Sequence, residues 1–503
     1  MMYVASKEDL LRLDAFAQNR KQEIRNTPDT LPIKGQTYYV SQTGSDEHDG
    51  TAPERAWKTP ARVSTADLQP EDAVLFRRGD VFRGPIQTKP GVTYAAWGEG
   101  EKPKLYSWEK DLADPSLWVL YDPATHIWKL TDTILDVGTL VFNHGEAHAY
   151  KHIPSYKNGE FVCRDEESRR FDVREELTRD LDLYWHFDAI LTEKPSRGED
   201  FPIPDVTQPE SLGELYLRCE RGNPGEVFSS IEALARRNLF CVGSNPNVHI
   251  DNLCLKYIGC HAVSAGGTCV RGLRVTNCEI GWIGGCIQHY AGTDPNYPEG
   301  GRGTVTRYGN GVEIYGGCED YEVSNCYIYQ VYDAAMTHQV TIRSTPRVMK
   351  RIRYANNLVE DCVYSIEYFL EKPSEETDSY MEDVEITRNL LRRAGYGWGQ
   401  QRHNKHTPAH VKGWSYVNTA SRFSITENIF DRAAYRMLHL VAEREESCPT
   451  LRGNVYVQHP GGMLGQYGAN HTEEPAILPF DANADRTVRE IFGDAEATVC
   501  EIE

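Results

Sequence analysis

The sequence feature that most constrains the fold is an internal repeat that begins near residue 247. In each copy an Asn precedes an apolar residue, a few polar or aromatic residues, and a small residue that opens an alternating run. A minimum step of about 25 residues with variable insertions predicts a parallel β-helix, in which coils stack and insertions form loops on one face. The copies start 25, 48, 32, 32, 39 and 26 residues apart, at Asn252, Asn277, Asn325, Asn357, Asn389, Asn428 and Asn454.

The recurring Asn suits a coil corner, because Asn tolerates left-handed backbone dihedrals and its side chain bonds to nearby backbone groups. We therefore expect stacked ladders of Asn and of small apolar residues, including Cys278 and Cys326. A leucine-rich repeat would show regular Leu spacing, and a propeller would show blade signatures. The sequence shows neither pattern, so it predicts an all-β solenoid.

Three domains are expected along the chain. An amphipathic helix is predicted over residues 7–27, from a capping box at Ser6 and Asp9 and a row of apolar residues. Short β-like runs separated by Gly, Pro and Asp start at Tyr38. The predicted domains are an N-terminal helical cap at 1–35, the β-helix at 36–469 with an elaborated β region at about 120–240, and a C-terminal tail or cap at 470–503.

The charge excludes several classes of protein. Lys and Arg number 54 against 74 Asp and Glu, a net charge of −20, which disfavours nucleic acid or an anionic membrane as a partner. No apolar stretch approaches the roughly 18 residues of a membrane span, and the first 30 residues carry acids, so we expect a soluble cytoplasmic protein. The 13 Cys lack CxxC pairs and are predicted to be reduced core side chains.

Several runs carry a family resemblance. YYVSQTGSDEHDGTAPERAWKTPARV, LQPEDAVLFRRGDVFRG and GVTYAAWGEGEKPKLY resemble the N-terminal part of pectate-lyase-like right-handed parallel β-helix proteins. GNGVEIYGG, QVYDAAMTHQ, YSIEYFL and AGYGWGQQR are similar to a bacterial subgroup related to β-helix glycoside hydrolases such as family 141. The resemblance covers about residues 36–465 and implies this fold and an enzyme that acts on carbohydrate.

Three coils place acidic and aromatic residues on one face when they are aligned on the small residue that opens each strand. These small residues are Gly311, Ala334 and Ser365. Strand alternation then predicts one outward column of Glu313, Met336 and Glu367 and a second of Tyr315, His338 and Phe369. Asp333 lies at the mouth of the middle coil.

The three acids, Glu313, Asp333 and Glu367, are the candidate catalytic residues. Hydrolysis of a glycosidic bond needs one carboxyl group to protonate the leaving group and another to activate water or attack the sugar. Glu313 and Glu367 are expected roughly 9–10 Å apart at the backbone, near the range of about 6.5–9.5 Å of inverting enzymes. Asp333 offers a closer pair, so retention and inversion both stay open.

Further residues are predicted to bind the substrate. The segment 394–414 supplies aromatic rings that stack on sugars and polar groups that bond hydroxyls. An insertion at 284–309 accounts for the 48-residue step and is expected to close over the cleft. The predicted substrate-binding residues are His338, Gln339, Tyr396, Trp398, Gln400, Arg402, His410, Tyr315 and His289. No metal or cofactor is expected, because His403, His406 and His410 match no strong metal motif and GSDEHDG at 44–50 is more typical of a turn than of a calcium loop.

Three functions remain open. The first is an intracellular glycoside hydrolase acting on oligosaccharides, with exo action favoured by the loops. The second is a polysaccharide lyase, which abstracts a proton next to a uronate carboxylate and needs basic groups such as Arg402, Lys405 and His338. The third is a non-catalytic carbohydrate-binding β-helix. The carboxylate column favours the first, and the oligomeric state is not indicated.

Overall fold

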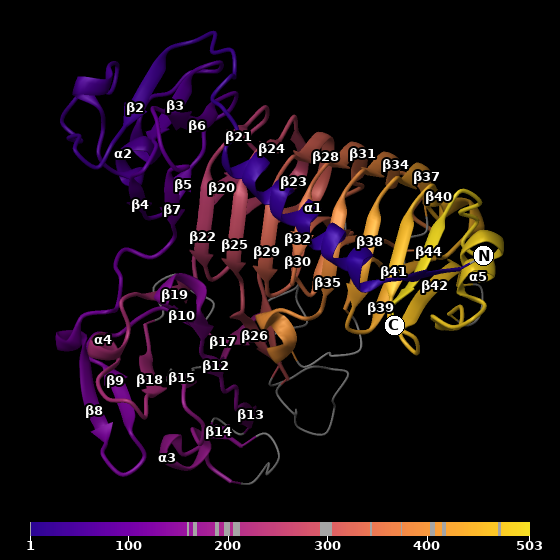
Figure 1. Cartoon of the computed structure of the whole chain (residues 1–503). Coiled ribbons are helices and arrows are strands. Elements are labelled where there is room, and N and C mark those ends of the chain that lie inside the picture. The colour runs from indigo at the N-terminus through magenta and orange to yellow at the C-terminus, as the bar shows by residue number, and fades with distance from the viewer. Residues whose placement is uncertain are drawn as a thin grey trace.

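The chain forms a right-handed parallel β-helix, as the repeat predicted (Figure 1). Strands from successive coils pair in parallel along three ladders that run the length of the solenoid. No helix among the described residues is both long and apolar enough to span a membrane. The computed structural model describes residues 2–502 apart from 158–159, 164–168, 187–190, 196–201, 205–211, 292–303, 343–344, 374, 403–407, 415–418 and 471–473.

The first ladder is an eleven-stranded parallel sheet. Its strands follow the chain order from β4 to β44, and the N-terminal strand β1 is added beyond β44. The strands are β4 (Val81–Arg83), β7 (Lys104–Tyr106), β22 (Cys254–Ile258), β25 (Glu279–Ile283), β29 (Tyr327–Val331), β32 (Leu358–Glu360), β35 (Leu390–Ala394), β38 (Ile429–Ala433), β41 (Val455–Gln458), β44 (Thr498–Ile502) and β1 (Tyr3–Ala5).

The second ladder carries the candidate site, and we call it the site ladder. After β5 (Ile86–Gln87) its strands are β20 (Phe240–Gly243), β23 (Val263–Arg271), β28 (Val312–Ser324), β30 (Ala334–Thr341), β33 (Tyr364–Glu371), β36 (Ala409–Gly413), β39 (Arg436–Ala442) and β42 (Met463–Ala469). An antiparallel strand, β43 (Leu478–Pro479), pairs with β42.

The third ladder closes the coil. The long strand β28 belongs to two ladders, because its first half pairs with β30 and its second half with β31. The strands of the third ladder are β2 (Thr37–Val40), β3 (Ala73–Arg77), β6 (Thr93–Trp97), β21 (His249–Asp251), β24 (Arg274–Thr276), the second half of β28, β31 (Val348–Ala355), β34 (Tyr380–Thr387), β37 (Ala420–Thr426) and β40 (Thr450–Arg452).

The predicted Asn ladder exists, but it is shifted by one residue in the later coils. Asn252, Asn277 and Asn325 have the expected positive φ. In the following coils the left-handed residue is the one before the repeated Asn, and the Asn side chain is buried. From Asn357 onward, each Asn donates its backbone N–H and its side-chain amide to the side-chain oxygen of the next one. The acceptors are Asn389, Asn428 and Asn454.

The C-terminal residues close one end of this ladder. Asp494 is fully buried and accepts hydrogen bonds from the backbone N–H and the side-chain amide of Asn454 at 3.1 and 2.8 Å. Phe480 and Phe492 join the main core on either side of α5 (Ala484–Glu490). Asp494 therefore supplies the acceptor for Asn454, the last Asn of the ladder.

The predicted N-terminal helix is α1 (Lys7–Arg25), and its capping box is present, since Ser6 and Asp9 each accept from the backbone N–H of the other. The helix lies along the eleven-stranded sheet (Figure 1), where Ala17 and Ile24 pack in one apolar cluster with residues of three strands. It covers a side of the solenoid rather than an end, because its apolar row faces the sheet.

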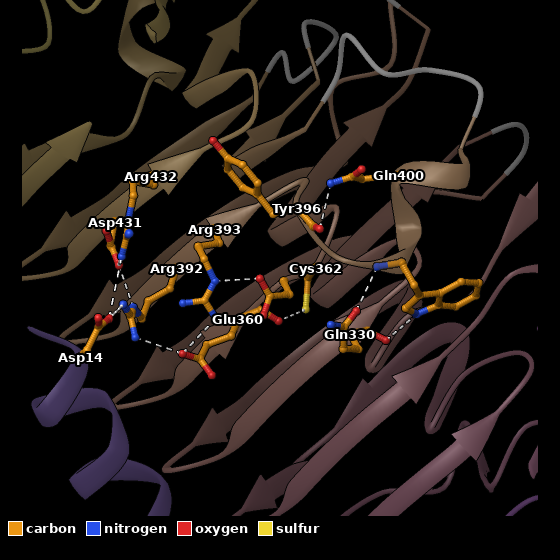
Figure 2. Close-up of polar contacts among 12 residues, drawn as sticks. Asp14, Gln330, Glu360, Cys362, Arg392, Arg393, Tyr396, Gln400, Asp431 and Arg432 are labelled. Carbon is orange, nitrogen blue, oxygen red and sulfur yellow. Dashed lines mark hydrogen bonds and ion pairs between the residues drawn. The ribbon is translucent and has the colours of Figure 1, made fainter. Parts of the chain in front are cut away.

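Buried charges hold α1 in this position. Lys21 pairs with Glu360 at 2.6 Å, and Arg392, which is almost fully buried, pairs with Asp14 (Figure 2). Arg392 also contacts Glu360 at 3.2 Å. Both pairs join the helix to a buried charged side chain of the sheet, so they help to fix α1 in place.

The elaborated region predicted at about 120–240 lies beside the solenoid and has its own apolar core (Figure 1). It enters after β7 and returns at β20. Its five-stranded sheet contains β8 (Trp118–Asp122), β9 (Ile127–Leu130), β18 (Glu214–Arg218), β15 (Asp182–His186) and β12 (Tyr150–Lys151), and its three-stranded sheet contains β10 (Val137–Phe142), β11 (Ala147–His148) and β19 (Ile231–Ala235). Small elements complete it: β13 (Ser155–Lys157), β14 (Glu160–Val162), β16 (Leu191–Pro195), β17 (Pro202–Pro204), α3 (Val173–Glu176) and α4 (Pro224–Val227).

Two segments link this inserted region to the site ladder. The insertion predicted at 284–309 contains an antiparallel hairpin of β26 (Cys286–Ala291) and β27 (Thr304–Tyr308), from which Arg307 donates to Gly138 O at 2.8 Å. In the loop before β36, the Gln401 amide donates to Ala149 O at 2.9 Å. The inserted region, the hairpin and the loop are thus joined beside one part of the ladder.

Candidate active site

The pairing of the site ladder defines one outward column of polar residues that we call the polar column. Its acids lie in the earlier strands, and it ends with basic and amide groups. Glu313 and Glu367 both pair with Thr337, so they lie two strands apart, roughly 9–10 Å at the backbone as predicted. In strand order the polar column is Ser264, Glu313, Thr337, Glu367, Lys412, His439 and Gln466.

The predicted register of the middle coil was wrong by one residue. Val312 pairs with Met336 rather than with Ala335, so Met336 points into the core and Thr337 takes its outward place. His338 is likewise fully buried, with its ring stacked on Tyr368 at 5.7 Å, and burial lowers its pKa to about 3. His338 therefore cannot contact a substrate on this face, because its imidazole is a core side chain.

The outward position assigned to His338 is occupied by Gln339. It pairs with Tyr315 on one side and Phe369 on the other. The two rings lie 6.4 Å apart in an edge-to-face arrangement, and Tyr315 is exposed. Of the predicted substrate-binding residues, Tyr315 and Gln339 are thus placed next to the polar column.

Asp333 lies directly before β30 and meets the loop that precedes β36. Arg402 of this loop forms an ion pair with Asp333, and its guanidinium lies 5.4 Å from the Tyr364 ring. The Asp333 charge raises the pKa of Arg402 against the effect of burial. The contact between Asp333 and Arg402, both predicted site residues, brings the loop onto the site ladder.

Glu313 is held by one residue of the neighbouring coil and one of its own coil. His261 forms an ion pair with it, and the Asn310 amide donates to Glu313 Oε2 at 3.4 Å. Burial alone would lower the pKa of His261, but the charges of Glu313 and Asp333 raise it overall. Sequence reasoning missed His261, although it stands two residues before the β23 strand in its repeat.

Glu367 has the surroundings of a protonated acid. It is 6% exposed, and burial followed by the Asp333 charge raises its pKa to about 8. Trp414 Nε1 donates to Glu367 Oε1 at 2.6 Å, which partly opposes that rise. A carboxyl group with such a pKa is mostly protonated at neutral pH, while Asp333 faces a guanidinium.

The basic end of the polar column was also missed. Lys412 follows Glu367 in register, contacts His439 Nδ1 and lies 4.0 Å from the Trp414 ring centroid. Arg436, from the start of β39, donates to Gln466. Alignment of the later coils on Glu367 could have revealed most of these residues in the sequence. Lys412, His439 and Gln466 share its register, whereas Arg436 does not.

The loop before β36 places three predicted residues around a pocket. Tyr396 and Gln400 are exposed, and the Gln400 amide donates to Tyr396 O at 2.8 Å (Figure 2). With Arg402 they line a cavity of ≈ 270 Å³ that also includes Val363 and Ala434. Arg402 connects this cavity to Asp333.

Two other predicted residues of this segment are core side chains. Trp398 is 3% exposed, donates from Nε1 to Gln330 O at 2.8 Å, and packs on Tyr332. His410 is fully buried near Phe430, and burial lowers its pKa to about 4. Neither can line a substrate surface, because both side chains are buried.

Some predicted residues lie outside the described part of the chain. This applies to His403, Lys405 and His406, and to the side chain of His289, whose backbone pairs with Thr306 in the β26–β27 hairpin. Within the described residues, no group of three or more His, Cys, Asp or Glu is arranged to hold a metal ion. The acidic run at 44–50 forms a turn in which Asp46 accepts from Lys58 N–H at 2.8 Å.

No model of a protein family matches the chain, and no curated protein matches it. Among solved structures, it is similar to a complex of XylC with xylose at 11% identity and a TM-score of 0.41, over 88% of this chain and 73% of that chain. It is also similar to a GH136 lacto-N-biosidase from Eubacterium ramulus, at 11% identity and a TM-score of 0.34, over 99% and 70% of the two chains. A family 28 exopolygalacturonase from Yersinia enterocolitica shows 10% identity and a TM-score of 0.33 over 86% and 68%.

Proposed function

We propose that this chain is a glycoside hydrolase in which Glu367 is the general acid and Asp333 the second carboxylate. The supporting observation is that two neighbouring acids, each less than a tenth exposed, have opposite surroundings. Asp333 is paired with Arg402, whereas Glu367 is desolvated, close to the Asp333 charge, and has a pKa of about 8. Glycoside hydrolysis needs one protonated and one ionised carboxyl group in this way.

Each group then has a defined role. Glu367 gives its proton to the leaving-group oxygen, so that the glycosidic bond breaks without releasing an alkoxide. Asp333 activates a water molecule or attacks the anomeric carbon. Glu313, paired with His261, lies two strands from Glu367 and is the alternative second carboxylate. The anomer of the first product, read by NMR, distinguishes water activation from attack on carbon.

The pocket beside Asp333 supports a substrate with a free end. Its ≈ 270 Å³ is just below the range of about 300–1,000 Å³ of drug-sized ligand pockets, so it suits one sugar residue. Tyr396 offers a ring for the sugar face, and Gln400 and Arg402 offer hydrogen bonds. We infer that an oligosaccharide enters by one end and that cleavage is of the exo type.

The test is hydrolysis of a panel of oligosaccharides and chromogenic glycosides by the wild type and by matched carboxamide variants. Glu367→Gln and Asp333→Asn should each lower kcat/KM by about 100-fold or more, as expected for loss of acid–base catalysis. Glu371→Gln is the control, since Glu371 lies in the same strand, where it accepts from Thr341 Oγ1. Full activity of both site variants would overturn the proposal, and binding without turnover would favour the carbohydrate-binding alternative.

A polysaccharide lyase is the second candidate, because Lys412 offers a base next to Glu367. Burial and the Arg436 charge lower the pKa of Lys412 to about 7, so that a substantial fraction is uncharged at neutral pH. A lyase needs such a base near a uronate carboxylate. Ultraviolet absorbance from an unsaturated product on a uronate polymer, lost in Lys412→Met, would decide for the lyase.

A further inference from the structure

The basic end of the polar column is a compact cluster of buried donors. Lys412 and His439 are each 2% exposed, Gln466 is 4% exposed and Arg436 is 7% exposed. They belong to the three adjacent strands β36, β39 and β42. The cluster is next to Glu367, because Lys412 is its partner in the neighbouring strand.

The contact between Lys412 and His439 selects the imidazole tautomer when the lysine is protonated. An ammonium group only donates, so His439 Nδ1, which faces it, is then the acceptor. His439 is neutral, because burial and the charges of Lys412 and Arg436 lower its pKa to about 2. Its proton is therefore on Nε2, which is buried and bonds to no other described group. A buried N–H of this kind requires an acceptor, and a ligand oxygen would supply one.

The charges of the cluster point to the same kind of ligand. Lys412 and Arg436 repel each other, and this repulsion lowers the pKa of Lys412 in addition to burial. Two acids face them, namely Glu367, which is mostly protonated at neutral pH, and the exposed Glu474. A negatively charged ligand would therefore be attracted more strongly than a neutral one.

We propose that Lys412, His439 and Arg436 form a subsite for an acidic group of the substrate, a carboxylate or a sulfate ester, one strand from Glu367. This rests on the proposed function only in taking the ligand to be a sugar chain. The oxygens of the acidic group accept hydrogen bonds from His439 Nε2 and charge-assisted hydrogen bonds from Lys412 and Arg436. The subsite makes an acidic oligosaccharide the preferred substrate class.

Calorimetric binding to three matched oligosaccharides tests this: a uronate oligosaccharide, its carboxyl-reduced neutral form, and the neutral form carrying one sulfate. At least one acidic form should bind the wild type at least tenfold more tightly than the neutral form, and which one does identifies the acidic group. His439→Phe and Lys412→Met should remove most of that preference. Lys412→Arg should retain it, and Lys350→Met, on the third ladder, is the control.

Equal binding of the acidic and neutral forms by the wild type would overturn the subsite, as would an unchanged preference in folded His439→Phe and Lys412→Met. Melting temperatures establish whether each variant is folded. If a variant is not folded, the test uses the other variant and Lys412→Arg, whose preference should equal that of the wild type. Because binding and hydrolysis are measured in separate assays, acid preference with no hydrolysis would refute the hydrolase and support the subsite. Hydrolysis without acid preference would support the hydrolase and refute the subsite.

Discussion

The hydrogen bond from Trp414 Nε1 to Glu367 Oε1, 2.6 Å long, allows a sharp test of how the site controls its acid. Burial and Asp333 raise the pKa of Glu367, and the indole N–H lowers it by stabilising the carboxylate. Trp414→Phe removes this donor but keeps an aromatic ring beside Lys412, whose Nζ lies 4.0 Å from the indole ring centroid. The pKa of Glu367 should therefore rise further in the variant.

The expected size follows from the strength of the lost bond. A hydrogen bond to a charged group contributes about 1.5–3 kcal/mol, and one pKa unit corresponds to about 1.4 kcal/mol. From a starting value of about 8, the pKa of Glu367 should rise by about one to two units. A general acid works only when protonated, so activity falls as pH rises through this pKa. The alkaline limb of kcat/KM should move upward by the same amount.

Infrared difference titration measures this pKa without a substrate. The protonated-carboxyl stretch of Glu367 is isolated by subtracting the spectrum of Glu367→Gln and is followed with pH in the wild type and in Trp414→Phe. Trp97→Phe is the control, since that indole donates to Val40 O in the first coils. The reasoning is refuted if the variant's midpoint is unchanged or lower, or if the wild-type signal titrates near the ordinary Glu value of 4.5.

Three further predictions concern the ladder and the loop. Asn389→Ala should destabilise the fold by about 3–5 kcal/mol in urea unfolding, because four buried hydrogen bonds are lost; a change below about 1 kcal/mol would contradict the ladder. Trp398→Ala should cost about 3–5 kcal/mol as a core truncation, whereas Tyr396→Ala should change stability by no more than about 0.5 kcal/mol and weaken oligosaccharide binding, as unfolding and calorimetry would show. For His410, whose pKa falls from 6.5 to about 4 on folding, the unfolded chain takes up the proton first. Its stabilisation, present above pH 6.5, should thus decline by about 3 kcal/mol towards pH 4, and His410→Leu should flatten that part of the pH–stability curve.

The fold was predictable because a repeat carries the same information many times. A coil corner needs a left-handed residue, and Asn252, Asn277 and Asn325 supply it. In the later coils Arg388 or Glu427 adopts the positive φ instead, and the buried amide ladder determines where Asn occurs. The pattern therefore indicated the solenoid correctly, while the two roles of Asn, one residue apart, could not be separated by spacing.

The error at the middle coil has a similar cause. Ala334 and Ala335 are consecutive small residues, and either can open a strand whose first inward side chain must be small. Strand side chains alternate with a period of two, so choosing Ala334 exchanged His338 with Gln339. The neighbouring coils contain one such residue at this point, and there the predicted outward positions of Glu313 and Glu367 agree with the pairing.

Burial of the polar column could not be predicted from the repeat, because it depends on segments distant in sequence. Outward acids on a solenoid are ordinarily solvated, yet Glu367 is only 6% exposed. The loop that carries Arg402 is fixed to the inserted region through Gln401, which accepts from Lys151 N–H at 3.2 Å. Loss of this cover would hydrate Glu367 and return its pKa towards 4.5, since burial is the largest cause of the rise. Through the ion pair of Arg402 with Asp333, this loop, which the inserted region helps to hold, contributes to the surroundings of Glu367 from a distant part of the sequence.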